Sequence, residues 1–184
     1  MRWPGRPQPL AHSIVATRRE VETFGKLLAS KAHRRRFAAA QRKAFVADGS
    51  DANWGVWWRH FSDYVPILDF IHALTYVYAA AMAGQATEKG WCAYREWAQA
   101  IWSGQVDRVI AALELRQQEW GEPTKKTSKT APSAIVATPL GYLRNQRSRM
   151  KYPEYRKQGL PMTSTYVESA VKQINRRMKG TEKL

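Results

Sequence analysis

The chain is poor in cysteine and in long apolar runs, and each shortage excludes a class of protein. Its 184 residues include a single cysteine, Cys92, which rules out internal disulfides and cysteine-rich zinc sites and suits a reducing compartment. No stretch approaches the roughly 18 apolar residues of a membrane span. The opening residues MRWPGRPQPL lack the apolar segment of a signal peptide. We therefore expect a cytoplasmic protein with no membrane partner.

Acidic side chains are also scarce. They are outnumbered by basic side chains most strongly at the two ends of the chain. The sequence has 30 Lys+Arg against 15 Asp+Glu, a net charge of +15. Residues 1–43 carry 11 basic and 2 acidic side chains and residues 141–184 carry 11 and 3, whereas residues 44–140 carry 8 and 10. A chain this basic usually binds a polyanion, most often nucleic acid. The two basic ends form either one shared face or two solvated tails.

Hydrophobic periodicity predicts an α/β fold that is rich in helices. After an irregular lead-in over residues 1–11, short apolar or β-branched runs predict strands at 12–17 (HSIVAT), 44–48 and 64–70. Predicted helices cover 18–42, 54–61, 71–84 (closed by Gly84), 88–120, 140–151 and 165–178. Residues 121–135 are expected to form a mobile linker, and residues 152–161 a turn-rich connection. The basic run KAHRRR, residues 31–36, is a solvated helix face or part of a phosphate-binding patch.

Three acidic residues follow or begin predicted elements in a way that suggests a shared site. Asp48 and Asp69 each end a predicted strand, and Glu168 lies in the first turn of the last predicted helix. Acids at the ends of neighbouring strands meet at one edge of a sheet. Converging carboxylates repel one another unless a cation neutralises them, and oxygen ligands suit Mg²⁺ or Mn²⁺. A metal pair of this kind is used to attack a phosphodiester.

Each acid also has a purely structural interpretation. Asp48-Gly49 is a strong turn signal. Asp69 followed by His72 fits a helix N-cap and a core histidine, and Thr165 followed by Glu168 fits a capping box. The sequence has no second histidine or cysteine at a zinc-like spacing from His72, which argues against zinc.

Three segments resemble the DDE-type transposases of bacterial insertion sequences, in the branch whose RNase H-like catalytic domain shares features with Mutator-like elements. These segments are AFVADGSDANWGVWWRHF, then YVPILDFIHALTYVYAAA, and YLRNQRSRMKYPEYRKQGLPMTSTYVESAVKQINRRMKG. The resemblance covers residues 10–183. The last segment is the most specific, because its GLP, VES and RMKG elements occur in order.

The resemblance implies an incomplete RNase H-like core with a large all-helical insertion and a C-terminal helix. Residues 12–72 would be the partial core, residues 73–150 the insertion, and residues 151–184 the returning catalytic-glutamate helix. Asp48 and Glu168 would be the catalytic, metal-binding acids for Mg²⁺ or Mn²⁺. Asp69 and His72 would be an accessory pair. The implied partners are DNA, both insertion-sequence ends and target, and a second copy or a full-length transposase.

Basic side chains near the implied glutamate are expected to contact DNA phosphates, which positions DNA without reading its sequence. The candidates are Arg147, Arg149, Lys151, Arg176, Arg177 and Lys179.

The chain departs from the family at the first metal-binding aspartate. Residues 1–47 contain no aspartate, and HSIVAT resembles a later strand of the core. The chain therefore looks like the C-terminal part of a catalytic domain. Three functions follow: DNA cleavage and strand transfer by a truncated transposase, DNA binding by an inactive remnant, or general binding of nucleic acid by a basic protein. For this chain alone we favour the remnant over the working enzyme, because a two-metal site needs the missing acid.

Overall fold

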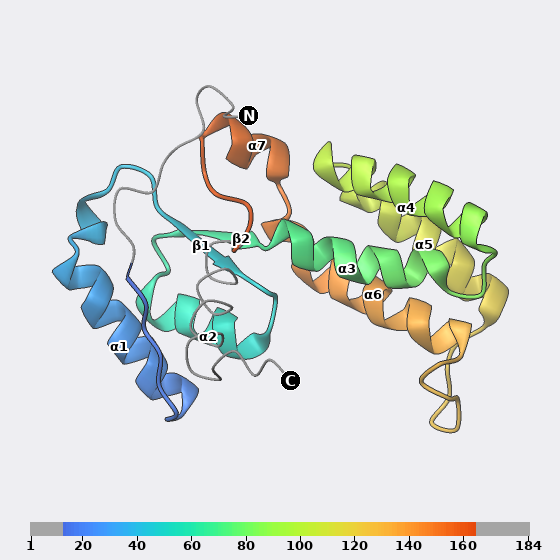
Figure 1. Ribbon diagram of the computed structural model, residues 1–184, viewed down its shortest axis with the longest axis horizontal. Coiled ribbons are helices and arrows are strands. Elements are labelled where there is room, and N and C mark those ends of the chain that lie inside the picture. Colours follow the sequence, from blue (N-terminus) through green and yellow to red (C-terminus); the bar gives the residue numbers. More distant parts are fainter. Residues whose placement is uncertain (1–12, 165–184) are drawn as a thin grey trace, which may run out of the picture.

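The computed structural model of the protein describes residues 13–164, which form a small sheet at one end and a bundle of helices at the other (Figure 1). The elements are α1 (Val21–Arg34), a 3-10 turn η1 (Phe37–Ala39), β1 (Ala44–Ala47), α2 (Asp51–His60), β2 (Val65–Leu68), α3 (Phe70–Met82), α4 (Thr87–Trp102), α5 (Val106–Trp120), α6 (Pro132–Gln146), a 3-10 turn η2 (Arg147–Arg149) and α7 (Tyr152–Lys157).

β1 and β2 pair in parallel, with α2 as the connection between them. The register joins Ala44 to Val65 and Ala47 to Leu68. Parallel strands need a crossover of this kind because a tight turn cannot connect them. Ile67 and Leu68 are fully buried, so the sheet forms part of the core. Both predicted strands, at 44–48 and 64–70, are confirmed.

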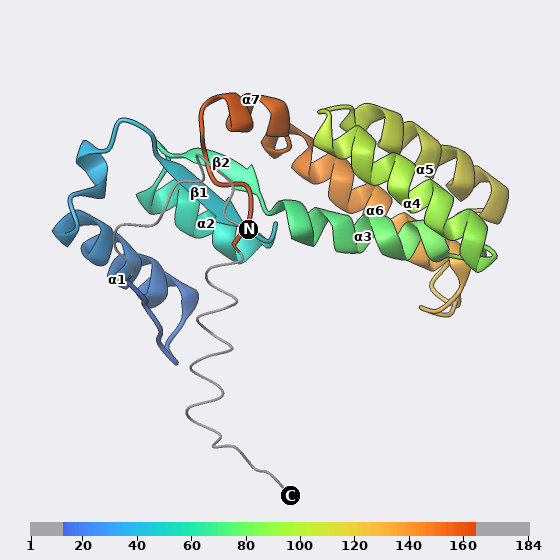
Figure 2. The ribbon, with the colours of Figure 1, turned by 45° about the horizontal axis from the view of Figure 1, so that its top comes forward.

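Helices α3 to α6 form a bundle in which each helix packs against two others. α3 contacts α4 and α6, and α5 contacts the same two helices. The bundle extends away from the sheet in both views, whereas α1 and α2 lie at the sheet end (Figures 1 and 2). Buried residues that include Val77, Ile101 and Leu113 form its core. The predicted single helix over 88–120 is wrong, because the chain turns at Gly104, which has a φ of +79°, and so forms two helices, α4 and α5.

The ends of the bundle helices follow local signals in the sequence. Asp69 caps α3, and Gly84 follows the last turn of that helix with a φ of +62°, a conformation that glycine adopts most easily. The predicted closure of this helix at Gly84 is confirmed. Pro132 stands in the first turn of α6, where its missing N–H costs nothing.

The predicted strand over HSIVAT is wrong for the described residues 13–17, which form no regular element. A β-branched run becomes a strand only when a neighbouring strand completes its hydrogen bonds, and the described sheet consists of β1 and β2 alone. Ile14 is 57% exposed, so this segment does not bury its apolar side chains as a core strand would.

Two boundaries near the end of the described chain also differ from expectation. α6 begins at Pro132, within the predicted linker, and continues through Pro139, so residues 140–146 are its second half and not the start of a helix. A proline inside a helix removes one hydrogen bond and its ring crowds the preceding turn, and we attribute its tolerance here to the burial of Pro139 in the bundle. The predicted turn-rich stretch 152–161 contains the short helix α7.

The described chain is therefore a helix-rich α/β fold. Among residues 13–164, no helix has both the length and the apolar character needed to cross a membrane.

Candidate functional site

Asp48 lies at the carboxyl end of β1, immediately after Ala47, and its side chain organises the turn that follows. Its Oδ1 accepts hydrogen bonds from the Ser50 backbone N–H, at 3.0 Å, and from Asn53 Nδ2, at 2.9 Å. Gly49 has a φ of +92°, which favours glycine. The turn interpretation and the sheet-edge interpretation of Asp48 are thus both correct.

The Asp48 carboxylate is exposed, and its second oxygen, Oδ2, has no hydrogen bond within the described part of the chain. Partial burial acts to raise the pKa of this carboxyl group, but hydrogen bonds from Ser50 and Asn53 outweigh burial and hold the pKa below its ordinary value. The group is therefore ionised at neutral pH and presents one carboxylate oxygen to solvent at the sheet edge.

Asp69 lies beside Asp48 at the same edge, as the sequence predicted. Its backbone N–H donates to the Ala47 carbonyl, at 2.8 Å, which continues the ladder between the two strands. Because paired strands run about 5 Å apart, the two aspartates are close neighbours. The side chain of Asp69 is only 3% exposed.

Both carboxylate oxygens of Asp69 are occupied by protein donors. Oδ1 accepts from the backbone N–H groups of Ile71, at 2.8 Å, and His72, at 3.1 Å, which caps α3. Oδ2 accepts from the Ser164 backbone N–H, at 2.6 Å, and from the Ser164 hydroxyl. The structural interpretation of Asp69 as an N-cap is therefore confirmed. Its second role is to hold Ser164, the last described residue, at the sheet edge.

Aromatic side chains from α3 and α6 cover the space next to Asp48. Tyr142 donates its hydroxyl to the Asp48 backbone carbonyl, at 2.7 Å, and stacks on Tyr76 with ring centroids 3.8 Å apart and planes 10° apart. The half-buried ring of His72 lies 6.3 Å from the Tyr142 ring. Burial, followed by the neighbouring Tyr76, Asp48 and Asp69, raises the pKa of Tyr142 far above its ordinary value, so the hydroxyl stays protonated.

Gln146, at the end of α6, joins this edge to α2. Its Nε2 donates to the Gly49 carbonyl, at 3.0 Å, and its Oε1 accepts from Trp54 Nε1, at 2.9 Å. The side chain is 5% exposed. Tyr142 and Gln146 were not identified from the sequence, because nothing local indicates that they contact a turn more than ninety residues away.

Two of the three expected DNA-contacting side chains in the described chain are engaged by other protein groups. Arg147 forms a two-point ion pair with Asp107, with Nε–Oδ1 and Nη2–Oδ2 distances of 2.6 Å. The Arg149 guanidinium lies 4.4 Å from the ring centroid of Trp54 and donates to Gln146 Oε1, at 3.0 Å. These contacts hold the two arginines in place on the protein.

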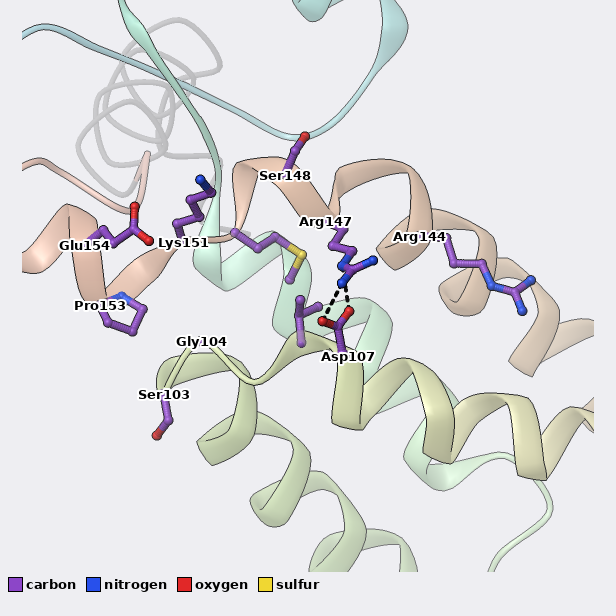
Figure 3. A pocket seen from close by; sticks show the side chains of 11 residues that line it. Ser103, Gly104, Asp107, Arg144, Arg147, Ser148, Lys151, Pro153 and Glu154 are labelled. Carbon is purple, nitrogen blue, oxygen red and sulfur yellow. Dashed lines mark hydrogen bonds and ion pairs between the residues drawn. The ribbon is translucent and has the colours of Figure 1, made fainter.

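Lys151 is exposed and lines a pocket of about 640 Å³ between α5, α6 and α7. Arg147 and Asp107 lie across from one another in the same pocket (Figure 3). Arg144, which also lines it, is paired with Glu114 at 2.6 Å. The cations of this pocket are therefore largely neutralised by nearby acids.

The remaining site candidates, Glu168, Arg176, Arg177 and Lys179, lie outside the described residues. Within residues 13–164, no group of three or more His, Cys, Asp or Glu side chains could hold a metal ion. The donors described here do not by themselves fit a two-metal centre, because Asp48 offers one open oxygen and both oxygens of Asp69 accept protein hydrogen bonds.

Comparisons of the chain with protein-family models, with curated proteins and with solved structures gave no match.

Proposed function

We propose that this chain binds DNA as a partial DDE-type transposase and does not cut DNA by itself. The observation that supports the proposal is the arrangement of Asp48 and Asp69 at the carboxyl edge of two parallel strands, with an exposed carboxylate on one and a buried carboxylate on the other. The net charge of +15 supplies the attraction to phosphates. An incomplete RNase H-like core is the fold that goes with this proposal.

Lack of cutting follows from the number of available metal ligands. A two-metal centre is built from several carboxylates, and Asp48 is the one acid at the described edge with an oxygen that accepts no protein hydrogen bond. Asp69 serves as a positioning residue that caps α3 and holds Ser164. His72 takes part in this structural role, because its backbone N–H is one of the two donors to Asp69 Oδ1 in the cap.

DNA cleavage is the second candidate, and the contact between Asp69 and Ser164 favours it. Ser164 is fixed at the sheet edge by two hydrogen bonds to Asp69 Oδ2. Glu168 follows four residues later, so the chain between them spans at most about 14 Å. Glu168 itself lies outside the described residues, but a tether of this length would allow it to approach Asp48, and these two acids would hold Mg²⁺ or Mn²⁺ if the chain, or a partner, supplies the further ligands.

The first test is DNA binding as a function of salt, with and without Mg²⁺. Fluorescence anisotropy of a labelled 30-base-pair duplex should show binding at 50 mM KCl that weakens roughly 10³-fold by 200 mM, as expected for about six phosphate contacts. EDTA should leave the affinity unchanged. Absence of binding at 50 mM, or an affinity that does not respond to salt, would overturn the proposal.

A further inference from the structure

The C-terminal end of α1 carries a dense group of cations at the sheet end of the molecule. This group, the α1 basic cluster, consists of Lys31, His33, Arg34, Arg35 and Arg36. Residues 33–36 are all exposed. Arg36 has a φ of +56° and a ψ of +32°, the left-handed conformation, which ends the helix and turns the chain sharply into η1.

Among residues 13–164, two arginines of this cluster lack the ion pairs that Arg144 and Arg147 form in the pocket beside Lys151. Within the described chain, Arg34 and Arg36 form no ion pair. The acid of α1, Glu22, is paired with Lys26 near the opposite end of the helix. Among the described residues, Arg34 and Arg36 therefore have no acid to neutralise their charge, although the sequence favoured Arg147, Arg149 and Lys151 as the phosphate contacts.

An apolar groove with aromatic walls lies directly beside the α1 basic cluster. Its volume is about 180 Å³. Lys31 and Arg35 contribute to its lining, together with Leu28, Phe37, Phe45, Phe61 and Tyr64. Phe37 comes immediately after Arg36 and is 49% exposed, so its ring is accessible from solvent.

A strand of nucleic acid has the chemistry that matches this combination of groups. Its phosphates are attracted to the cations, and an unpaired base has an aromatic face that stacks on phenylalanine or tyrosine. A base within a duplex is already stacked on its neighbours and must first be unstacked and unpaired before it can enter an apolar groove. The combination of cations and aromatic rings therefore favours a single-stranded segment.

We propose that the α1 basic cluster and the adjoining groove bind single-stranded DNA, with phosphates on Lys31, Arg34 and Arg36 and one base stacked on Phe37. This inference rests on the proposed function, since it takes DNA as the partner. It adds the contact surface and the form of DNA that the surface accepts.

The test compares two DNA forms and two kinds of variant by fluorescence anisotropy. The probes are a labelled 20-nucleotide oligothymidine and a labelled 20-base-pair duplex, each measured from 50 to 200 mM KCl. Phe37→Ala should weaken binding of the single strand roughly 5- to 150-fold, because one stacked base is lost, and should leave duplex binding unchanged. Phe37→Trp should retain single-strand binding because it keeps an aromatic surface. Circular dichroism should show that both variants are folded, as expected for a half-exposed side chain.

The charge test uses two triple variants that remove the same number of cations. Lys31→Gln, Arg34→Gln and Arg36→Gln together should make the salt dependence of single-strand affinity shallower by about two units of slope. The control is Lys125→Gln, Lys126→Gln and Lys129→Gln, in the exposed loop between α5 and α6, which lies at the other end of the molecule from α1 (Figures 1 and 2). This control should change the slope by much less.

Two results would overturn the inference. One is single-strand affinity that Phe37→Ala leaves unchanged, as expected if another segment of the chain or a second copy fills the groove. The other is a salt dependence of single-strand affinity that becomes as shallow in the loop control as in the α1 variant. That result would mean that the total charge of the protein, and not the position of these cations, decides binding. If the parent protein binds neither probe, the proposed function is wrong as well. If every variant binds both probes as the parent does, only the inference about this surface is wrong.

Discussion

At the residue scale, Asp48 and Gly49 show how one dipeptide can carry two interpretations that are both right. The Asp48 side chain closes a turn through Ser50 and Asn53, and the same side chain lies exposed at the carboxyl edge of β1. The turn fixes the orientation of the carboxylate. A turn signal at the end of a strand is therefore no argument against a ligand-binding role.

The account predicts opposite effects for the same substitution at two glycines. A Cβ added at Gly49 would lie 2.8 Å from the Tyr142 ring, and the φ of +92° disfavours alanine there. Gly49→Ala should lower the free energy of unfolding by about 2–4 kcal/mol. Gly55 lies inside α2 with nothing within 4 Å of an added Cβ. Gly55→Ala should raise the free energy of unfolding by about 0.8 kcal/mol.

Urea denaturation of the two variants and the parent checks this pair. If the two substitutions change the free energy of unfolding equally, or if Gly49→Ala is more stable than the parent, the turn does not pack against Tyr142 as described.

The residue scale also marks the limit of what the sequence could predict at this site. The adjacency of Asp48 and Asp69 and the capping of α3 were predictable, because strand ends and N-caps leave local patterns. The contacts of Tyr142 with Asp48 and of Gln146 with Gly49 were not, because each joins residues more than ninety positions apart. Only the packing of α6 against the sheet end brings them together.

At the scale of elements, the contact between Asp69 and Ser164 joins the sheet edge to the end of the described chain. Asp69→Asn should keep the cap on α3, because an amide oxygen accepts the same two N–H bonds, but its Nδ2 cannot accept from Ser164. We expect the free energy of unfolding to fall by about 2–3 kcal/mol, since hydrogen bonds to a buried charged group are lost.

Thermal or urea unfolding measures this effect against two companions. Ser164→Ala removes only the hydroxyl bond and should cost about 1 kcal/mol. Asp63→Asn removes an exposed carboxylate that pairs with Lys43 and should lower the free energy of unfolding much less than Asp69→Asn does, because solvent screens an exposed ion pair. If Asp69→Asn lowers the free energy of unfolding no more than Asp63→Asn does, the hydrogen bonds between Asp69 and Ser164 do not stabilise the fold.

Elements were predicted well where their own periodicity defines them and less well where a neighbour decides. α3 has an apolar pattern that needs no outside information, whereas the single helix predicted over 88–120 is two helices, α4 and α5, because Gly104 takes a positive φ between them. The run HSIVAT has strand composition, but residues 13–17 have no strand beside them. α6 continues through Pro139 because its buried face packs in the bundle, which local rules for proline do not include.

At the scale of the whole molecule, charge and the sheet edge together define the proposed function. In the proposal, the net charge of +15 attracts a polyanion, and the sheet edge presents one exposed carboxylate. Arg147 contacts Asp107 and Arg149 contacts Trp54, whereas Arg34 and Arg36 form no ion pair within the described chain. Sequence counting revealed the excess of positive charge, and only the fold indicates which cations are available.

The measurement that tests the central claim most directly is nicking of a supercoiled plasmid in Mg²⁺ or Mn²⁺ under conditions where DNA binding is saturated. The parent protein should bind the plasmid and leave it supercoiled, because the described edge offers a single open carboxylate. Metal-dependent nicking by the parent that Asp48→Asn and Glu168→Gln abolish would contradict this account and establish the enzyme. Asp51→Asn, a nearby exposed acid in the first turn of α2, is the matched control and should behave as the parent does.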